Sequence, residues 1–157
     1  MPDQLQPIIE NLVDCFDGKP WYGVSVMEKL EMISWKRVND KKYGNKSIAV
    51  LVQHIINWRI FVLKKLEGDA AYTIEMDSDT DWTPIQIENQ QQWEGLKQQL
   101  VNTQTKILSL LHATDDAILS KQVPGKNYTF SPILTSIAQH DIYHLGQIAM
   151  LNYEQSS

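Results

Sequence analysis

Residues 131–153 combine a helical apolar period with two histidines, and this combination limits the folds that the chain can adopt. His140 and His144 are four residues apart, so on a helix they lie about 40° apart around the axis and one turn apart along it. Their face is polar in the middle and apolar toward both ends, and its other members are Ile133, Ile137, Gln147 and Leu151. Burial of this face places two imidazoles inside a protein core, where each needs a polar partner.

A second stretch, residues 46–67, repeats this pattern with a single histidine. His54 interrupts an apolar face whose other members are Leu51, Ile55, Trp58 and Val62. A lone buried histidine is more often a hydrogen-bonded core residue than a metal ligand. Two helices that each bury histidine change this expectation, because one shared metal ion satisfies all three imidazoles at once. The sequence therefore predicts a metal site formed by His54, His140 and His144.

Proline, glycine and capping residues divide the chain into four long helical stretches. Thr83-Pro84-Ile85-Gln86 matches a capping box with proline at the first helical position, and Ser131-Pro132 is a second start of this kind. The predicted stretches are residues 4–16 with Asp3 as N-cap, a short piece over 25–33, residues 46–67 closed by Gly68, residues 83–111 and residues 131–153. This pattern predicts an all-α fold with one domain over residues 1–157. Its architecture is a four-helix bundle with a short extra helical segment between the first two long helices. The connections over 68–82 and 115–128 are long enough to cap one end of the bundle.

Charge and composition argue against several classes of protein. The formal net charge is −5, the positive residues are scattered, and no basic face is evident, so nucleic acid is not the expected partner. The longest apolar runs fall far short of the roughly 20 residues that span a bilayer. No secretory signal pattern opens the sequence, so we expect a soluble, cytoplasmic protein without a membrane partner. Cys15 is the single cysteine, which excludes an intrachain disulfide and is typical of a small buried hydrophobe.

Three blocks of sequence resemble the DinB-like superfamily, whose members are four-helix bundles with metal-dependent relatives. They are residues 18–23 (GKPWYG), residues 47–55 (SIAVLVQHI) and residues 140–148 (HDIYHLGQI). The resemblance implies that His54, His140 and His144 bind a divalent metal ion, most often zinc or nickel, and that the protein forms a homodimer. Relatives include S-transferases that use a low-molecular-weight thiol as co-substrate, an isomerase-type activity and many proteins without assigned chemistry. The family name refers to induction by DNA damage and not to DNA binding.

Three neutral histidines leave a metal ion with its full charge and at least one open coordination position. A structural zinc site is usually closed by a fourth ligand, and nothing in the sequence brings Cys15 to the histidines. The run His140-Asp141-x-x-His144 is similar to the zincin motif. A zincin needs a third ligand downstream, however, and the short remainder of the chain cannot supply it, so we reject a zinc protease.

An open metal site lowers the pKa of a bound thiol or of a bound water, which leads to S-transfer or to hydrolysis. The sequence does not decide between these reactions. We favour a metal-dependent enzyme acting on a small-molecule substrate, with S-transfer ahead of hydrolysis on the strength of the resemblance. The alternative is a non-catalytic, stress-associated metal-binding bundle that acts through a protein partner.

Gln147 and Trp58 are the predicted substrate-binding residues, because each lies on a histidine-bearing face within about one turn of a ligand. Asp141 is rotated about 100° from His140, which favours a contact with a basic residue over catalysis. Tyr143 is expected to pack, and His112 is expected to interact with the negative end of its own helix. The other four tryptophans are predicted to be core residues or loop anchors: Trp21, Trp35, Trp82 and Trp93.

Residues 48–63 carry more apolar side chains than one bundle seam requires, and Val24 and Trp93 add to this surplus. Surplus apolar surface implies a second contact, either with residues 24–33 or with another chain.

Overall fold

The computed structural model describes residues 3–41 and 44–156, and within these ranges it contains helices but no β-strand. The predicted all-α class is therefore confirmed. In chain order the elements are α1 (Leu5–Asp17), α2 (Val26–Glu31), the short 3-10 helix η1 (Trp35–Arg37), α3 (Ile48–Leu66), α4 (Gln90–His112), α5 (Ala117–Ser120) and α6 (Phe130–Ser156).

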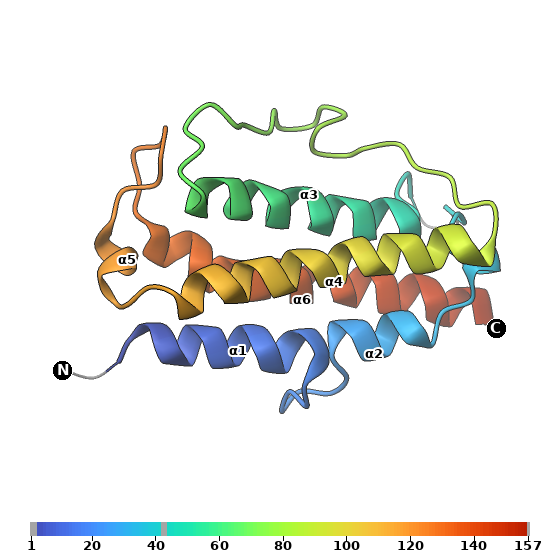
Figure 1. The fold of residues 1–157 in the computed structure, drawn as a ribbon. Helices are drawn as coiled ribbons and strands as arrows, with labels where there is room; N and C mark the ends of the chain where they lie inside the picture. The colour runs from blue at the N-terminus through green and yellow to red at the C-terminus, as the bar shows by residue number, and fades with distance from the viewer. Residues whose placement is uncertain (1–2, 42–43, 157) are drawn as a thin grey trace.

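Four rods of helix lie side by side and form the bundle (Figure 1). α2 continues the line of α1, so the extra segment predicted between the first two long helices extends one edge of the bundle. α1 and α6 run in one direction, whereas α3 and α4 run in the other. The bundle therefore has one long crossover connection between two parallel neighbours.

That crossover, residues 67–89, determines what covers α3. A helix of 19 residues is about 28 Å long, and a parallel neighbour requires the chain to travel this distance back before the next helix begins. The crossover accordingly runs along the outer side of α3 (Figure 1). The expectation that it caps one end of the bundle is wrong, because the direction of α4 requires a lengthwise path.

The ends of α3 follow from local chemistry. The Ser47 hydroxyl accepts a hydrogen bond from the backbone N–H of Val50 at 3.2 Å and so satisfies an orphan donor of the first turn. Gly68 follows the last turn with a φ of 92°, a left-handed conformation that glycine adopts without strain. The predicted glycine stop is confirmed.

The predicted start of the third long helix is wrong. α4 begins at Gln90, and the Asn89 side chain caps it by accepting from the Gln92 N–H at 2.8 Å. Thr83 is unavailable as a cap because its hydroxyl donates to the Asp79 carbonyl oxygen and accepts from the Asn57 amide. The crossover thus uses the predicted capping residue as an anchor on α3.

Smaller differences occur at the other helix starts. The Asp3 carboxylate accepts a hydrogen bond from the Gln6 N–H at 2.9 Å, but α1 begins at Leu5. The Asp116 carboxylate, in the connection between α4 and α5, accepts hydrogen bonds from the Gln4 and Leu5 N–H groups. α6 begins at Phe130, one residue before the predicted Ser131.

The core consists of two apolar clusters with polar side chains between them. One cluster gathers side chains of α2, the N-terminal halves of α3 and α4 and the C-terminal half of α6, together with Phe16 at the end of α1. The other gathers side chains of α1, the C-terminal parts of α3 and α4 and the N-terminal half of α6. Buried polar residues near the boundary between the two clusters include His54, Arg59, Thr103, Gln104, Asp141 and His144. Burial of polar groups is costly, so this concentration of them at the centre of the bundle indicates that a functional site lies there.

The apolar surplus of α3 is used inside the chain. Ile48, Val52 and Ile56 are fully buried in one cluster with Val26 and Leu30 of α2. Trp93 is also fully buried, and its indole N–H donates to the Ile33 carbonyl oxygen at 3.1 Å. The first of the two predicted contacts for this surplus, the segment before α3, is therefore the observed one.

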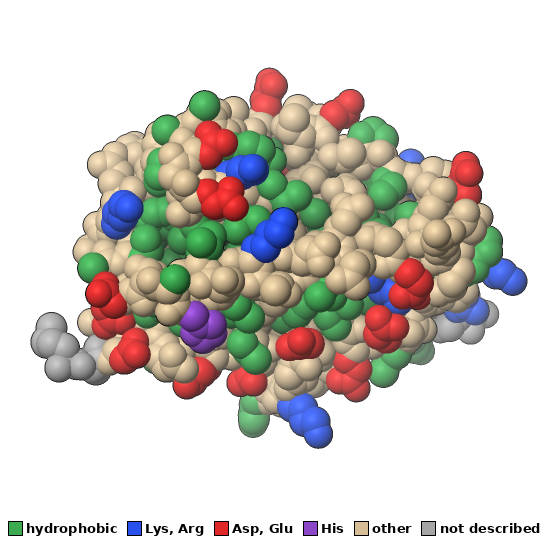
Figure 2. Space-filling view, in the orientation of Figure 1, with side chains coloured by type: hydrophobic (Ala, Val, Ile, Leu, Met, Phe, Trp, Pro, Cys, Tyr) green, Lys and Arg blue, Asp and Glu red, His purple; other side chains and the backbone are tan. Residues whose placement is uncertain are grey.

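The surface carries charges of both signs. Figure 2 shows lysine and arginine side chains scattered over one face, with more numerous acidic side chains among them. Within the described ranges, none of the helices has the length and apolar character needed to cross a membrane.

Candidate metal centre

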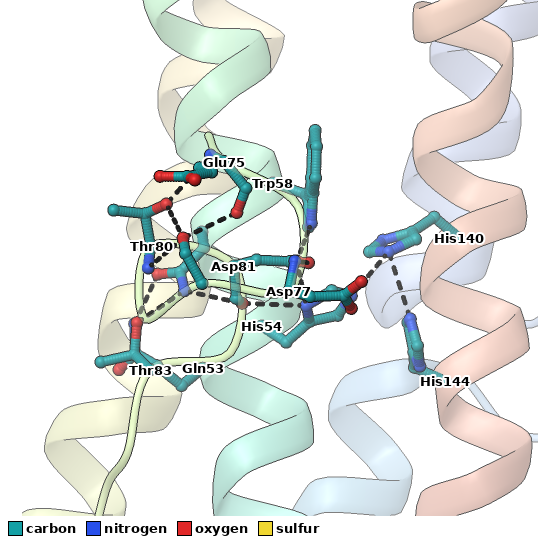
Figure 3. A network of polar contacts seen from close by, with 12 residues as sticks. Gln53, His54, Trp58, Glu75, Asp77, Thr80, Asp81, Thr83, His140 and His144 are labelled. Carbon is teal, nitrogen blue, oxygen red and sulfur yellow. Dashed lines mark hydrogen bonds and ion pairs between the residues drawn. The ribbon is translucent and has the colours of Figure 1, made fainter. Parts of the chain in front are cut away.

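Three histidines from two helices converge at the middle of the bundle. His54 on α3 and His144 on α6 are buried, whereas His140 on α6 is half-buried. The Nε2 atom of His140 lies 3.1 Å from Nε2 of His54 and 3.2 Å from Nε2 of His144 (Figure 3). The structure thus brings together the three side chains that the sequence pattern singled out.

The opposite ring nitrogens of two of these histidines have acceptors. His54 Nδ1–H donates to Asp81, whose backbone carbonyl oxygen and Oδ1 both lie 3.0 Å away. His144 Nδ1–H donates to Gln147 Oε1 at 2.6 Å. Because the proton of each ring is held on Nδ1, the Nε2 lone pairs of His54 and His144 point toward the space between the three rings.

Asp81 lies in the crossover, is buried, and accepts hydrogen bonds from several residues around it. Its Oδ1 accepts from the Trp58 indole N–H at 2.8 Å, and its Oδ2 accepts from the Asp77 N–H at 2.9 Å (Figure 3). Asn57 also donates to the Asp81 carbonyl oxygen. These contacts fix the loop on α3 and hold the carboxylate against the back of His54.

Trp82 covers the same imidazole from another side. Its ring stacks on His54 with centroids 3.7 Å apart and planes within 4° of parallel, and its edge faces the ring of His144. The Lys46 ammonium lies 4.1 Å from the Trp82 ring centroid, where the ring attracts a cation. The stacked indole shields His54 from water and restricts the rotation of its ring.

Burial keeps all three histidines neutral near pH 7. Desolvation, followed by the neighbouring histidines His144 and His54, lowers the pKa of His140 to about 3. Desolvation also lowers the pKa of His54 and of His144, each against the opposing effect of its hydrogen-bond partner. Neutral imidazole is the form that binds a metal ion.

The donor set fits a divalent transition-metal ion. Tetrahedral zinc with Zn–N distances near 2.0–2.1 Å requires ligand nitrogens about 3.3 Å apart, close to the two observed Nε2 spacings. One proton shared between the rings can bind the lone pairs of only two Nε2 atoms, whereas one metal ion can bind all three. His54, His140 and His144 could hold such an ion, and within the described ranges no other carboxylate, thiol or imidazole joins their group.

A buried ion pair lies directly behind the histidines. Arg59 of α3 donates to Asp141 Oδ2 through Nη2 at 2.6 Å and through Nε at 3.0 Å. Arg59 Nη1 also donates to Gln104 of α4 at 2.8 Å, so three helices meet at this guanidinium. The predicted contact of Asp141 with a basic residue is confirmed.

The other predicted residues have mixed outcomes. Trp58 lines a cavity that reaches His140, but its indole N–H is already bound to Asp81. The carbonyl oxygen of Gln147 binds His144, which makes it a positioning group for that histidine. Tyr143 is exposed, contrary to the expectation that it packs, although its ring lies edge-on to His144 at 5.0 Å.

Three residues lie away from the site or differ from expectation. Cys15 is buried in the apolar cluster of α1, and its thiol lies 3.5 Å from the Asn11 side-chain oxygen, consistent with the predicted structural role. His112 is the last residue of α4, at the helix end where it was predicted, and it is exposed. Trp21 is fully exposed, so the expectation of a core or anchoring role is wrong for this tryptophan.

Sequence reasoning missed the contributions of Asp81 and Trp82. The segment Asp77-Ser78-Asp79-Thr80-Asp81 offers three aspartates with the same spacing, and nothing in the sequence marks the last one as buried. Only the lengthwise path of the crossover brings it to His54. A metal-ligating histidine is expected to have a carboxylate or carbonyl partner, but which residue supplies it depends on tertiary structure.

A comparison with protein-family models matches residues 29–148 to the DinB superfamily. The matched range contains α3, α4 and most of α6, and with them His54, His140 and His144. Comparisons with curated proteins and with solved structures found no match. Because the family match covers well over half of the sequence and includes the whole histidine site, the chain belongs to the DinB superfamily.

Proposed function

We propose that the protein is a divalent-metal-dependent enzyme that transfers a thiol to an electrophilic small molecule at the three-histidine site. One observation carries the proposal: three neutral imidazoles direct Nε2 atoms into a common space, and the Nδ1 groups of His54 and His144 are held by hydrogen bonds on the outside. Such a set leaves at least one coordination position for a substrate. Zinc and nickel are the favoured ions, since both accept imidazole ligands.

When bound, the ion supplies a Lewis acid that favours the deprotonated form of a thiol or of water. The residues of the chain orient the ligands and exclude water. Asp81 and Gln147 fix the orientation of two ligating rings, and Trp82 and Trp58 exclude water from the side of α3. A restrained, water-poor site increases the strength of every electrostatic contact within it.

The state of the nearby carboxylates favours S-transfer over hydrolysis. Hydrolysis of amides or esters generally uses a carboxylate or histidine that is available as a general base. Asp81 is bound by His54, Trp58 and Asp77, and Asp141 is paired with Arg59. In S-transfer a thiol forms a new sulfur–carbon bond, the carbon–leaving-group bond breaks, and the thiol proton departs with the leaving group or to water. This reaction requires no free general base once the pKa of the thiol is lowered.

A non-catalytic metal-binding bundle that acts through a protein partner is the second candidate. The exposed apolar side chains Tyr143 and Met150 on α6 support it, because Tyr143 borders His144 and offers a contact surface beside the site.

An assay panel tests the proposal. Low-molecular-weight thiols are combined with a chlorobimane-type electrophile, and ester, amide and phosphoester substrates are tested in parallel. We expect metal-dependent thioether formation that disappears in His54→Ala and persists in the matched control His112→Ala, whose histidine is exposed at the end of α4. Turnover of only the hydrolytic substrates would replace S-transfer by hydrolysis. No turnover with any substrate would favour the binding protein.

A further inference from the structure

A cavity of about 180 Å³ lies between α3 and α6 and reaches the metal centre at His140. Most of its wall is apolar or aromatic, and the residues that form this wall are Trp58, Phe61, Val62, Tyr128, Ile133 and Ile137. His140 is both a wall residue of the cavity and the most exposed of the three histidines. A group seated in the cavity is therefore next to the atoms that the site would act on.

The size of the cavity limits what it can hold. An apolar protein cavity of about 150 Å³ binds benzene, so this cavity has room for one six-membered ring or a branched alkyl group of similar size. Water gains little in a space with so few polar partners.

The polar end of the cavity does not favour a charged ligand. Arg59 and Asp141 border the cavity, but they neutralise each other through two short hydrogen bonds. Asp141 Oδ1 is buried and has no hydrogen-bond partner among the described residues, and this oxygen repels an anion. An anionic ligand would lose its hydration without gaining an unpaired cation.

We infer that this cavity binds a compact, uncharged apolar group of the substrate, an aromatic ring or a branched alkyl group, beside His140. The assignment of that group to a substrate rests on the proposed function, whereas binding in the cavity can be measured without any reaction. The site then has two parts: three histidines for the reacting atom, and an apolar subsite that selects what is attached to it.

Toluene is the probe, and benzoate is its charged counterpart. Both are titrated into the protein as purified and into chelator-treated protein, and isoleucine methyl signals are followed by NMR. We expect saturable shifts of the Ile133 and Ile137 signals with toluene in both samples, and none with benzoate. The metal content of the same samples is measured separately, so loss of the proposed metal function and loss of the cavity binding give different results.

Ile133→Trp fills the cavity from a half-buried position and should weaken toluene binding by about ten-fold or more. Ile8→Trp is the matched control, because Ile8 is half-buried against the same apolar cluster but does not line the cavity. Ser136→Phe adds bulk at an exposed position of the cavity wall and serves if Ile133→Trp fails to fold. Absence of saturable toluene shifts, equal binding of benzoate, or unchanged toluene binding in the folded filled variants would overturn the inference.

Discussion

At the scale of single residues, the position of His54 depends on Asp81. Removal of an outer hydrogen-bond partner of a metal-ligating histidine typically costs 10–100-fold in metal affinity. We therefore expect Asp81→Ala to weaken metal binding by about this factor, since the His54 ring loses its carboxylate partner and the crossover loses its hydrogen bond to Trp58. Competition with a chelator of known affinity measures the effect. Asp79→Ala, two residues earlier and exposed, should bind metal like the unmodified protein, and equal weakening in both variants would refute the role of Asp81.

Protons should destabilise the metal-free protein through the same histidines. The pKa of His140 is lowered to about 3 in the folded chain, so below about pH 6.5 the unfolded chain binds protons that the folded chain does not. The free energy of unfolding should therefore fall as the pH is lowered from about 7 to 5, with up to about 1.4 kcal/mol per pH unit from His140. Urea unfolding of chelator-treated protein measures this slope. His140→Gln should have a smaller slope, and an unchanged slope would contradict the account.

At the scale of elements, the Arg59–Asp141 pair joins α3 to α6 next to the ligands. Loss of one partner leaves a buried charge without compensation, so Asp141→Ala should lower the free energy of unfolding by about 3–5 kcal/mol. Glu67→Ala removes the exposed Lys64–Glu67 pair and should cost less than about 1 kcal/mol. Urea denaturation compares the two variants. A cost for Asp141→Ala as small as that for Glu67→Ala would show that the buried pair is dispensable.

The helices that carry the ligands could be predicted, because periodicity and end signals are local properties. His54, His140 and His144 interrupt apolar faces, and this pattern is visible in the sequence because these parts of the two faces turn toward the core: His54 and His144 are buried and His140 is half-buried. The start of α4 could not be predicted, because Thr83 has two uses and only the path of the crossover decides that it binds Asn57 instead of capping a helix. The contribution of Asp81 depends on the same path.

At the scale of the whole molecule, the exposed apolar residues are the remaining sign of association. The surplus of α3 is buried internally, but Tyr143 and Met150 lie seven residues apart on α6 and are 67% and 62% exposed. We propose that a second copy of the chain packs on this face, as closed homodimers commonly do through one shared patch. Light scattering over a wide concentration range should give a dimer mass that the double variant Tyr143→Glu/Met150→Glu reduces to a monomer mass. Met32→Glu, at a position 59% exposed directly after the end of α2, is the control. A monomer mass for the unmodified protein at high micromolar concentration would exclude the dimer.

The central claim is that His54, His140 and His144 hold one divalent ion, and metal content tests it most directly. Purified protein is loaded with zinc or nickel and freed of excess ion. The number of metal ions per chain is then measured by inductively coupled plasma mass spectrometry. We predict about one ion per chain in the unmodified protein and in His112→Ala, as expected for a single three-histidine site. The double variant His140→Ala/His144→Ala should retain its helical far-ultraviolet circular dichroism but bind essentially no ion. Full occupancy in this folded double variant would contradict the account.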